Sequence, residues 1–223
     1  MQESHKTKLV LFDLDGTLVD TALDFIHSLN NILRANHRDE LDGEIIRSNV
    51  SEGSAKLIEI GFKIPSNHPD LEKYRKELLI EYKKNLTNKS KPFLGIEKLI
   101  KHLDFYDIPY GVVTNKPLKY AKPLIENFSI FDTSKILICP DHVKNIKPDP
   151  EGILLACSSL DINPSESVYI GDHPGDIEAG MNAGTKTIGC LYGYSLPQKY
   201  NRNKTMFVDQ ASEIISLLSL IHI

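Results

Sequence analysis

The stretch Lys8-Leu-Val-Leu-Phe-Asp-Leu-Asp-Gly-Thr17 decides the fold of this chain. Its first half is a short apolar run, which is typical of a buried strand. Its second half, from Asp13 to Thr17, consists of residues that favour a turn. The sequence therefore places two aspartates, Asp13 and Asp15, directly after a predicted first strand.

The chain after Pro92 alternates between short apolar runs and helical patterns. The apolar runs predict strands at 110–113, 136–139, 168–170 and 187–191. The helical patterns predict helices at 96–103, 118–127, 148–160 and 176–183, and an apolar tail at 214–223 predicts a last helix. Strands that alternate with helices indicate a parallel sheet covered on both faces. We therefore expect an α/β protein with a Rossmann-like three-layer core.

The segment between the first strand and Pro92 has a different character. Apolar residues recur there at helical spacing, as at Leu23, Ile26 and Leu29, and no clear strand pattern is present. This predicts two domains: a discontinuous α/β core made of residues 1–17 and 92–223, and an inserted all-helical domain at 18–91.

Polar residues follow the predicted strands or open a predicted helix. These residues are Asp13, Asp15, Thr114, Asn115, Lys147 and Asp172. Ligands of open α/β sheets bind beyond the carboxyl ends of the strands, so we expect these side chains to meet there. We also expect Lys147 to start a helix, with Pro148 at the first helical position.

This set of residues suits phosphoryl transfer. Crowded carboxylates repel one another unless a cation compensates them, and an oxygen site with few protein ligands suits Mg²⁺. A lysine at a helix N-terminus suits a phosphate, and Gly16 lets the backbone approach a ligand. Asp13 can serve as a nucleophile, with Asp15 two residues on as the acid and base. Taken alone, the stretch from Asp13 to Thr17 is also compatible with an ordinary polar turn.

Four motifs, in order, resemble those of the haloacid dehalogenase superfamily of phosphohydrolases. They are Phe12-Asp-Leu-Asp-Gly-Thr17, Val113-Thr-Asn115, Lys147-Pro-Asp-Pro150 and Gly171-Asp-His-Pro-Gly-Asp176. The resemblance covers nearly the whole chain, and it implies that the helical insertion is the cap domain of these enzymes. The dehalogenase branch lacks the second aspartate of the first motif, so Asp15 argues against dehalogenation.

The resemblance also implies a role for each residue. Asp13 is expected to be the nucleophile and a Mg²⁺ ligand, and Asp15 the acid and base, with its backbone carbonyl on the metal. Asp172 is expected to bind Mg²⁺, with Asp176 supporting the water shell of the metal or orienting Lys147. The residues expected to hold the substrate phosphate are Thr114, Asn115 and Lys147.

A closer resemblance is to the phosphoglycolate phosphatase family, through Gly111-Val-Val-Thr-Asn-Lys-Pro117 and Tyr192-Gly-Tyr194. Within it, Ile138-Cys-Pro-Asp-His-Val-Lys-Asn145 resembles the branch that hydrolyses N-acetylmuramic acid 6-phosphate in bacterial cell-wall recycling. The cap loop Ser51-Glu52-Gly53-Ser54 corresponds to the specificity loop of the family. Glu52 would sit poorly beside the carboxylate of phosphoglycolate, which favours a larger substrate. Both substrates stay open on the sequence alone.

Two other functions compete with hydrolysis: a sugar phosphomutase with the same aspartyl-phosphate chemistry, and a non-catalytic phosphate sensor. The net charge of −4 gives no case for nucleic acid as a partner. No run approaches 18 apolar residues, and the three cysteines have no metal or disulfide spacing. We therefore expect a cytoplasmic enzyme, monomeric or homodimeric, with a small phosphate ester as its substrate. Lys116 and Lys119 are expected to be solvated.

Overall fold

The core of the protein is a parallel six-stranded sheet. The computed structural model describes residues 7–196 and 205–221. The strands lie in the order β5-β4-β1-β6-β7-β8, and every pair runs parallel. Their bounds are β1 Leu9–Phe12, β4 Tyr110–Val113, β5 Leu137–Ile138, β6 Ser167–Gly171, β7 Lys186–Cys190 and β8 Met206–Val208. The expected α/β, Rossmann-like fold is confirmed.

Strand β1 lies at the centre of this sheet, between β4 and β6. Every one of its residues is buried, which explains why the sequence here is continuously apolar rather than alternating. The five strands expected from the sequence are present, with ends that differ by at most one residue. The sequence analysis missed β8, because its apolar run is only three residues long and lies between polar residues.

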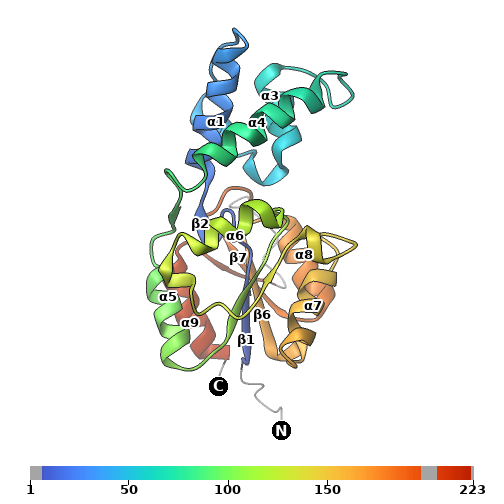
Figure 1. The fold of residues 1–223 in the computed structure, drawn as a ribbon. Coiled ribbons are helices and arrows are strands. Elements are labelled where there is room, and N and C mark those ends of the chain that lie inside the picture. Colours follow the sequence, from blue (N-terminus) through green and yellow to red (C-terminus); the bar gives the residue numbers. More distant parts are fainter. Residues whose placement is uncertain (1–6, 197–204, 222–223) are drawn as a thin grey trace. The chain divides into compact units, whose positions relative to one another are not determined.

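Helices cover both faces of the sheet, as Figure 1 shows, with α5 and α9 on one side and α7 and α8 on the other. Their bounds are α5 Ile96–Phe105, α6 Leu118–Glu126, α7 Glu151–Ser159, α8 Pro174–Ala183 and α9 Ala211–Ile221. Short 3-10 helices lie at Ser129–Phe131, Pro140–His142 and Pro164–Glu166. Within the residues described, no helix has the length and apolar character needed to cross a membrane.

Helix α7 begins later than the sequence analysis expected. Its first residue is Glu151, so Lys147 and Pro148 lie in the preceding loop. Pro150 disfavours helical geometry at Asp149, the residue before it, and the Asp149 side chain accepts a hydrogen bond from the Glu151 amide at 2.9 Å. Lys147 therefore does not start a helix, and its charge reaches the site from a loop.

Residues 20–91 form a second compact unit, separate from the unit made by residues up to 19 and from 92 onward. The sequence analysis placed this boundary at 18. The helices of the second unit are α1 Ala22–Ala35, α2 Gly43–Arg47, α3 Ser54–Phe62 and α4 Leu71–Asn85, with a 3-10 helix at Val50–Glu52. Stacked rings of Phe25 and Tyr82, 3.9 Å apart, join α1 to α4. The short strands β2 (Val19–Asp20) and β3 (Lys91–Pro92) pair where the chain enters and leaves this helical unit.

Candidate active site

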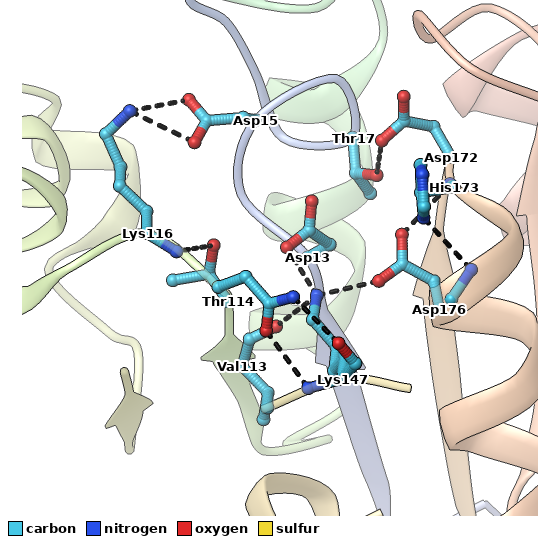
Figure 2. A network of polar contacts seen from close by, with 12 residues as sticks. Asp13, Asp15, Thr17, Val113, Thr114, Lys116, Lys147, Asp172, His173 and Asp176 are labelled. Carbon is cyan, nitrogen blue, oxygen red and sulfur yellow. Dashed lines mark hydrogen bonds and ion pairs between the residues drawn. The ribbon is translucent and has the colours of Figure 1, made fainter. Parts of the chain in front are cut away.

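Asp13 and Lys147 form a buried ion pair at the carboxyl end of β1. Asp13 is the first residue after that strand, and its Oδ1 lies 2.6 Å from Nζ of Lys147 (Figure 2). Burial raises the pKa of Asp13 to about 6, although the Lys147 charge acts in the opposite direction. The two residues are 134 positions apart, so the tertiary fold alone creates this contact.

Three further oxygens surround the ammonium group of Lys147. They are Asp176 Oδ1 at 2.7 Å, the Tyr169 hydroxyl at 2.8 Å and the Val113 carbonyl at 3.1 Å. Burial disfavours the charged amine, but the adjacent carboxylates outweigh it and hold the pKa of Lys147 well above its usual range. Lys147 is therefore a fixed positive charge, not a proton carrier.

Asp172 follows β6 and is completely buried. Its Oδ1 accepts a hydrogen bond from the Thr17 hydroxyl at 3.1 Å, and its Oδ2 accepts one from the Tyr194 amide at 2.8 Å. Gly16 has a φ of +84°, and a Cβ there would overlap the Asp172 carboxylate. A Cβ at Gly193 would likewise overlap Asp172 and the Gly16 carbonyl. Both glycines are thus required for close packing around this carboxylate.

Carboxylate oxygens of Asp13, Asp172 and Asp176 lie within 4.8 Å of one another. Burial and the other two carboxylates raise the pKa of Asp172 well above its ordinary value. When ionised, the three groups carry three negative charges, and Lys147 contributes one positive charge. The remaining two charges match a divalent cation, and oxygen ligands of this kind suit Mg²⁺. The residues present therefore fit a Mg²⁺ site, with Asp176 as a third side chain beside the expected pair Asp13 and Asp172.

Asp15 lies apart from this cluster and points to a different lysine. Both of its carboxylate oxygens contact Nζ of Lys116, at 2.9 and 3.0 Å (Figure 2). The Lys116 side chain is 5% exposed, so the expectation that it is solvated is wrong. Lys116 is the third residue after β4, where the chain turns at the carboxyl edge of the sheet, and this place brings its side chain to Asp15.

Thr114 and Asn115 follow β4, as expected, and their side chains hydrogen-bond to different parts of the chain. The Thr114 hydroxyl accepts a hydrogen bond from the Lys116 amide at 3.2 Å. The Asn115 side chain pairs with the backbone of Lys147 in both directions: Nδ2 donates to the carbonyl at 3.0 Å, and Oδ1 accepts from the amide at 3.1 Å. Asn115 thus fixes the loop that carries Lys147. Its expected contact with the substrate phosphate stays a prediction.

Asp176 links the site to helix α8. Its Oδ1 contacts Lys147, and its Oδ2 accepts a hydrogen bond from the His173 amide at 3.0 Å, at the N-terminus of the helix. Asp176 therefore caps the helix and orients Lys147 with the same carboxylate. The contact with Lys147 was one of the two alternatives expected from the sequence.

The expected specificity loop lies in the helical unit, between its 3-10 helix and α3. Ser51 and Glu52 end that short helix, Gly53 has a φ of +89°, and Ser54 begins α3. The Ser54 hydroxyl accepts a hydrogen bond from Nε of Arg75 at 3.0 Å. Glu52 is exposed. The substrate role of these residues stays a prediction.

Three residues around the site were not identified from the sequence. Thr17 contacts Asp172, Tyr169 contacts Lys147 and Lys116 contacts Asp15. Tyr169 lies in the middle of an apolar strand and shows no signal of function there. In the sequence, Lys116 looks like an ordinary surface lysine that follows Thr114 and Asn115. The structure shows that its side chain is buried.

A parallel sheet with a buried aspartate–lysine pair and a carboxylate cluster at its carboxyl edge is typical of an α/β enzyme of the phosphoryl-transfer class. The comparisons with known proteins identify the family. The family model for haloacid dehalogenase-like hydrolases matches residues 10–190. The chain belongs to this family, and it is a phosphatase.

Curated relatives share most of their length with this chain. It is 40% identical over 216 residues to an N-acetylmuramic acid 6-phosphate phosphatase of Pseudomonas aeruginosa, covering 96% of this chain and 95% of the relative. It is 30% identical over 219 residues to a phosphoglycolate phosphatase of Psychrobacter arcticus, covering 95% of both. A crystal structure described as a predicted phosphoglycolate phosphatase from Haemophilus somnus superposes with a TM-score of 0.84 at 23% identity, covering 97% of this chain and 99% of that one.

Proposed function

We propose that the protein is a Mg²⁺-dependent phosphate monoester hydrolase that works through an aspartyl phosphate and acts on N-acetylmuramic acid 6-phosphate. The observation that carries the chemistry is the buried contact between Asp13 and Lys147 at 2.6 Å. The substrate assignment is supported by the 40% identity to a phosphatase named for that sugar phosphate.

In the first step, a carboxylate oxygen of Asp13 attacks the phosphorus of the bound ester. The bond between phosphorus and the ester oxygen breaks, and the leaving alkoxide takes a proton from Asp15. This step requires that Asp15 carry a proton in the substrate complex, so its ion pair with Lys116 would have to open first. Lys147 holds Oδ1 of Asp13, which would leave Oδ2 for the attack. The products of this step are the free alcohol, ionised Asp15 and a phosphoryl group on Asp13.

In the second step, water attacks the phosphorus of the aspartyl phosphate and gives a proton to Asp15. The bond between phosphorus and the Asp13 oxygen breaks, which restores the carboxylate and releases inorganic phosphate. Asp15 is again protonated, so both residues return to their starting forms.

Bound Mg²⁺, held by Asp13 and Asp172 with Asp176 nearby, would neutralise charge on the transferred phosphoryl group. The residues of this chain do the remaining work. Thr114 would hold the phosphate, and Lys147 would attract it through its positive charge, because both residues lie at the carboxyl edge of the sheet. Asn115 would keep the Lys147 loop in place.

A second substrate, 2-phosphoglycolate, is supported by the 30% identity to a phosphoglycolate phosphatase. We favour the sugar phosphate because its named relative is more similar to this chain and because Glu52, in the expected specificity loop, would repel the carboxylate of phosphoglycolate. The proposed cellular role is therefore cell-wall recycling in the cytoplasm.

The test is release of free phosphate with Mg²⁺, comparing kcat/KM for the two substrates. We expect a preference of about 100-fold for the sugar phosphate, equal to about 2.7 kcal/mol of transition-state discrimination. The reverse preference would reassign the enzyme to phosphoglycolate. An isomerised sugar phosphate without free phosphate would indicate a phosphomutase instead, and binding without turnover of any ester would indicate a sensor.

A further inference from the structure

Tyr169 lies in β6 and is completely buried. Its hydroxyl oxygen is 2.8 Å from Nζ of Lys147 and 2.8 Å from the carbonyl of Val113 in β4. We propose that Tyr169 is a positioning residue, whose hydroxyl holds the Lys147 ammonium where it orients Asp13 for attack. This inference rests on the proposed function, because it assigns Asp13 as the nucleophile.

The role of Tyr169 follows from how the hydrogens of the Lys147 ammonium and of the Tyr169 hydroxyl are shared among the acceptors around them. The ammonium has three hydrogens, and four oxygens lie within 3.1 Å of it: Asp13 Oδ1, Asp176 Oδ1, the Tyr169 hydroxyl and the Val113 carbonyl. The Tyr169 hydroxyl has one hydrogen. It donates that hydrogen to the Val113 carbonyl, which at 2.8 Å is nearer than the other acceptor, Asp176 Oδ1 at 3.4 Å. The three ammonium hydrogens are therefore left for the two carboxylates and the tyrosine oxygen.

Loss of the hydroxyl would leave the Val113 carbonyl without the hydrogen of the tyrosine. The third ammonium hydrogen would then turn to that carbonyl, now 3.1 Å away, and would draw Nζ toward β4 and away from Asp13. Lys147 would keep its charge and its attraction for phosphate. The alignment of the nucleophile would suffer, which affects the transition state more than the bound substrate.

Tyr110 provides a matched control in the same sheet. It lies at the amino end of β4 and is 1% exposed. Its hydroxyl contacts the Ile130 carbonyl at 3.2 Å and the Thr133 hydroxyl at 3.0 Å. Tyr110→Phe therefore removes a buried tyrosine hydroxyl that is also bonded to a backbone carbonyl, but at the opposite edge of the sheet from Lys147.

The experiment compares Tyr169→Phe with Tyr110→Phe in the full chain with Mg²⁺. The measured quantities are kcat, KM and the inhibition constants of inorganic phosphate and of orthovanadate, a transition-state mimic. For Tyr169→Phe we expect kcat to fall about tenfold, KM to stay within about threefold, and orthovanadate to bind about tenfold more weakly while phosphate binds as before. For Tyr110→Phe we expect all four quantities to stay within about twofold.

Orthovanadate binding in a Lys147→Met background tests whether the hydroxyl acts through the lysine. Tyr169→Phe should cause no further loss of affinity there. The inference is overturned if Tyr169→Phe keeps the wild-type kcat or if Tyr110→Phe lowers kcat as much as Tyr169→Phe does. It is also overturned if the losses of orthovanadate affinity caused by Tyr169→Phe and by Lys147→Met add in the double variant. Failure of Tyr169→Phe to fold, where Tyr110→Phe folds, would also overturn it by making the hydroxyl a requirement of the fold. A wild-type enzyme that hydrolyses no phosphate ester would instead refute the proposed function.

Discussion

Both units of the protein bury aspartates, but they satisfy them in different ways. In the helical unit, Asp24 of α1 is completely buried. It accepts hydrogen bonds from the backbone amides of Lys89 and Ser90, at 2.8 and 3.1 Å, and from the Ser90 hydroxyl. Neutral donors stabilise this carboxylate, and the contacts join the start of the unit to its end.

In the core, Asp13, Asp172 and Asp176 lie together, and Lys147 contacts two of them. Burial raises the pKa of Asp13 to about 6, and the nearby Asp176 charge adds to the rise, while Lys147 acts in the opposite direction. The comparison shows that burial alone does not mark a functional aspartate. A functional aspartate is marked by other carboxylates close to it, because together they carry an excess of negative charge that a bound ligand can neutralise.

The largest effect should come from Asp13→Asn, which tests the functional side of this comparison. The amide keeps the shape of the side chain but cannot form the phosphoryl intermediate, so we expect phosphate release to fall by about 1,000-fold or more, equal to about 4 kcal/mol. Thermal unfolding should show an intact fold with unchanged or higher stability, because one crowded charge is removed. Activity within tenfold of wild type would contradict the mechanism.

Asp24→Asn should give the opposite pattern. The amide nitrogen would face hydrogen-bond donors in a buried site, so we expect the free energy of unfolding to fall by about 2 kcal/mol. At a temperature well below unfolding, kcat/KM should stay within about threefold of wild type. Denaturant unfolding followed by phosphate assays on the folded protein checks both. An intact stability would mean that these hydrogen bonds do not hold the unit together.

The pH dependence of Mg²⁺ stabilisation sharpens the comparison further. The folded state raises the pKa of Asp13 from 3.8 to about 6. Stability from this group in the metal-free protein is therefore complete below about pH 4 and is lost as the pH rises through about 6. Mg²⁺ should relieve that loss, so we expect it to stabilise the protein by about 1–2 kcal/mol more at about pH 7.5 than at about pH 5.

Thermal unfolding with and without Mg²⁺ at the two pH values measures this difference. Asp13→Asn is the matched control, and it should weaken the pH dependence of the Mg²⁺ effect. Asp24→Asn should leave that dependence as in the wild type. Equal stabilisation at both pH values in the wild type would show that the cluster does not bind the ion through Asp13.

The smallest effects compare two asparagines with the same hydrogen-bond pattern. Asn115 pairs in both directions with the backbone of Lys147, and Asn30 pairs in both directions with the backbone of Leu41, at 2.9 and 3.0 Å. Each change to Ala should cost about 1 kcal/mol of stability. Asn115→Ala should also lower kcat about tenfold, because it loosens the Lys147 loop, whereas Asn30→Ala should leave kcat within about twofold. Equal kcat losses in both variants would contradict this role of Asn115.

Sequence reasoning was accurate where a local pattern carries the information. The apolar run at 110–113 matches β4 at both ends. The start of α7 was placed three residues early, although Pro150 was visible in the sequence, because the effect of a proline on the residue before it was not applied. Strand β8 was missed because its apolar run is only three residues long.

The sequence by itself determined the order of strands and helices, and it placed the acidic and phosphate-type residues after the strands. It did so because strand and turn preferences act over a few neighbouring residues. Only the tertiary structure decided that Lys116 is buried against Asp15, that Tyr169 reaches Lys147, and that Asp24 is a structural aspartate while Asp13 lies in a charged cluster. These facts depend on contacts between residues that are 22 to 134 positions apart in the chain. At such separations, the burial of a side chain and the charges around it depend on which segments the fold brings together.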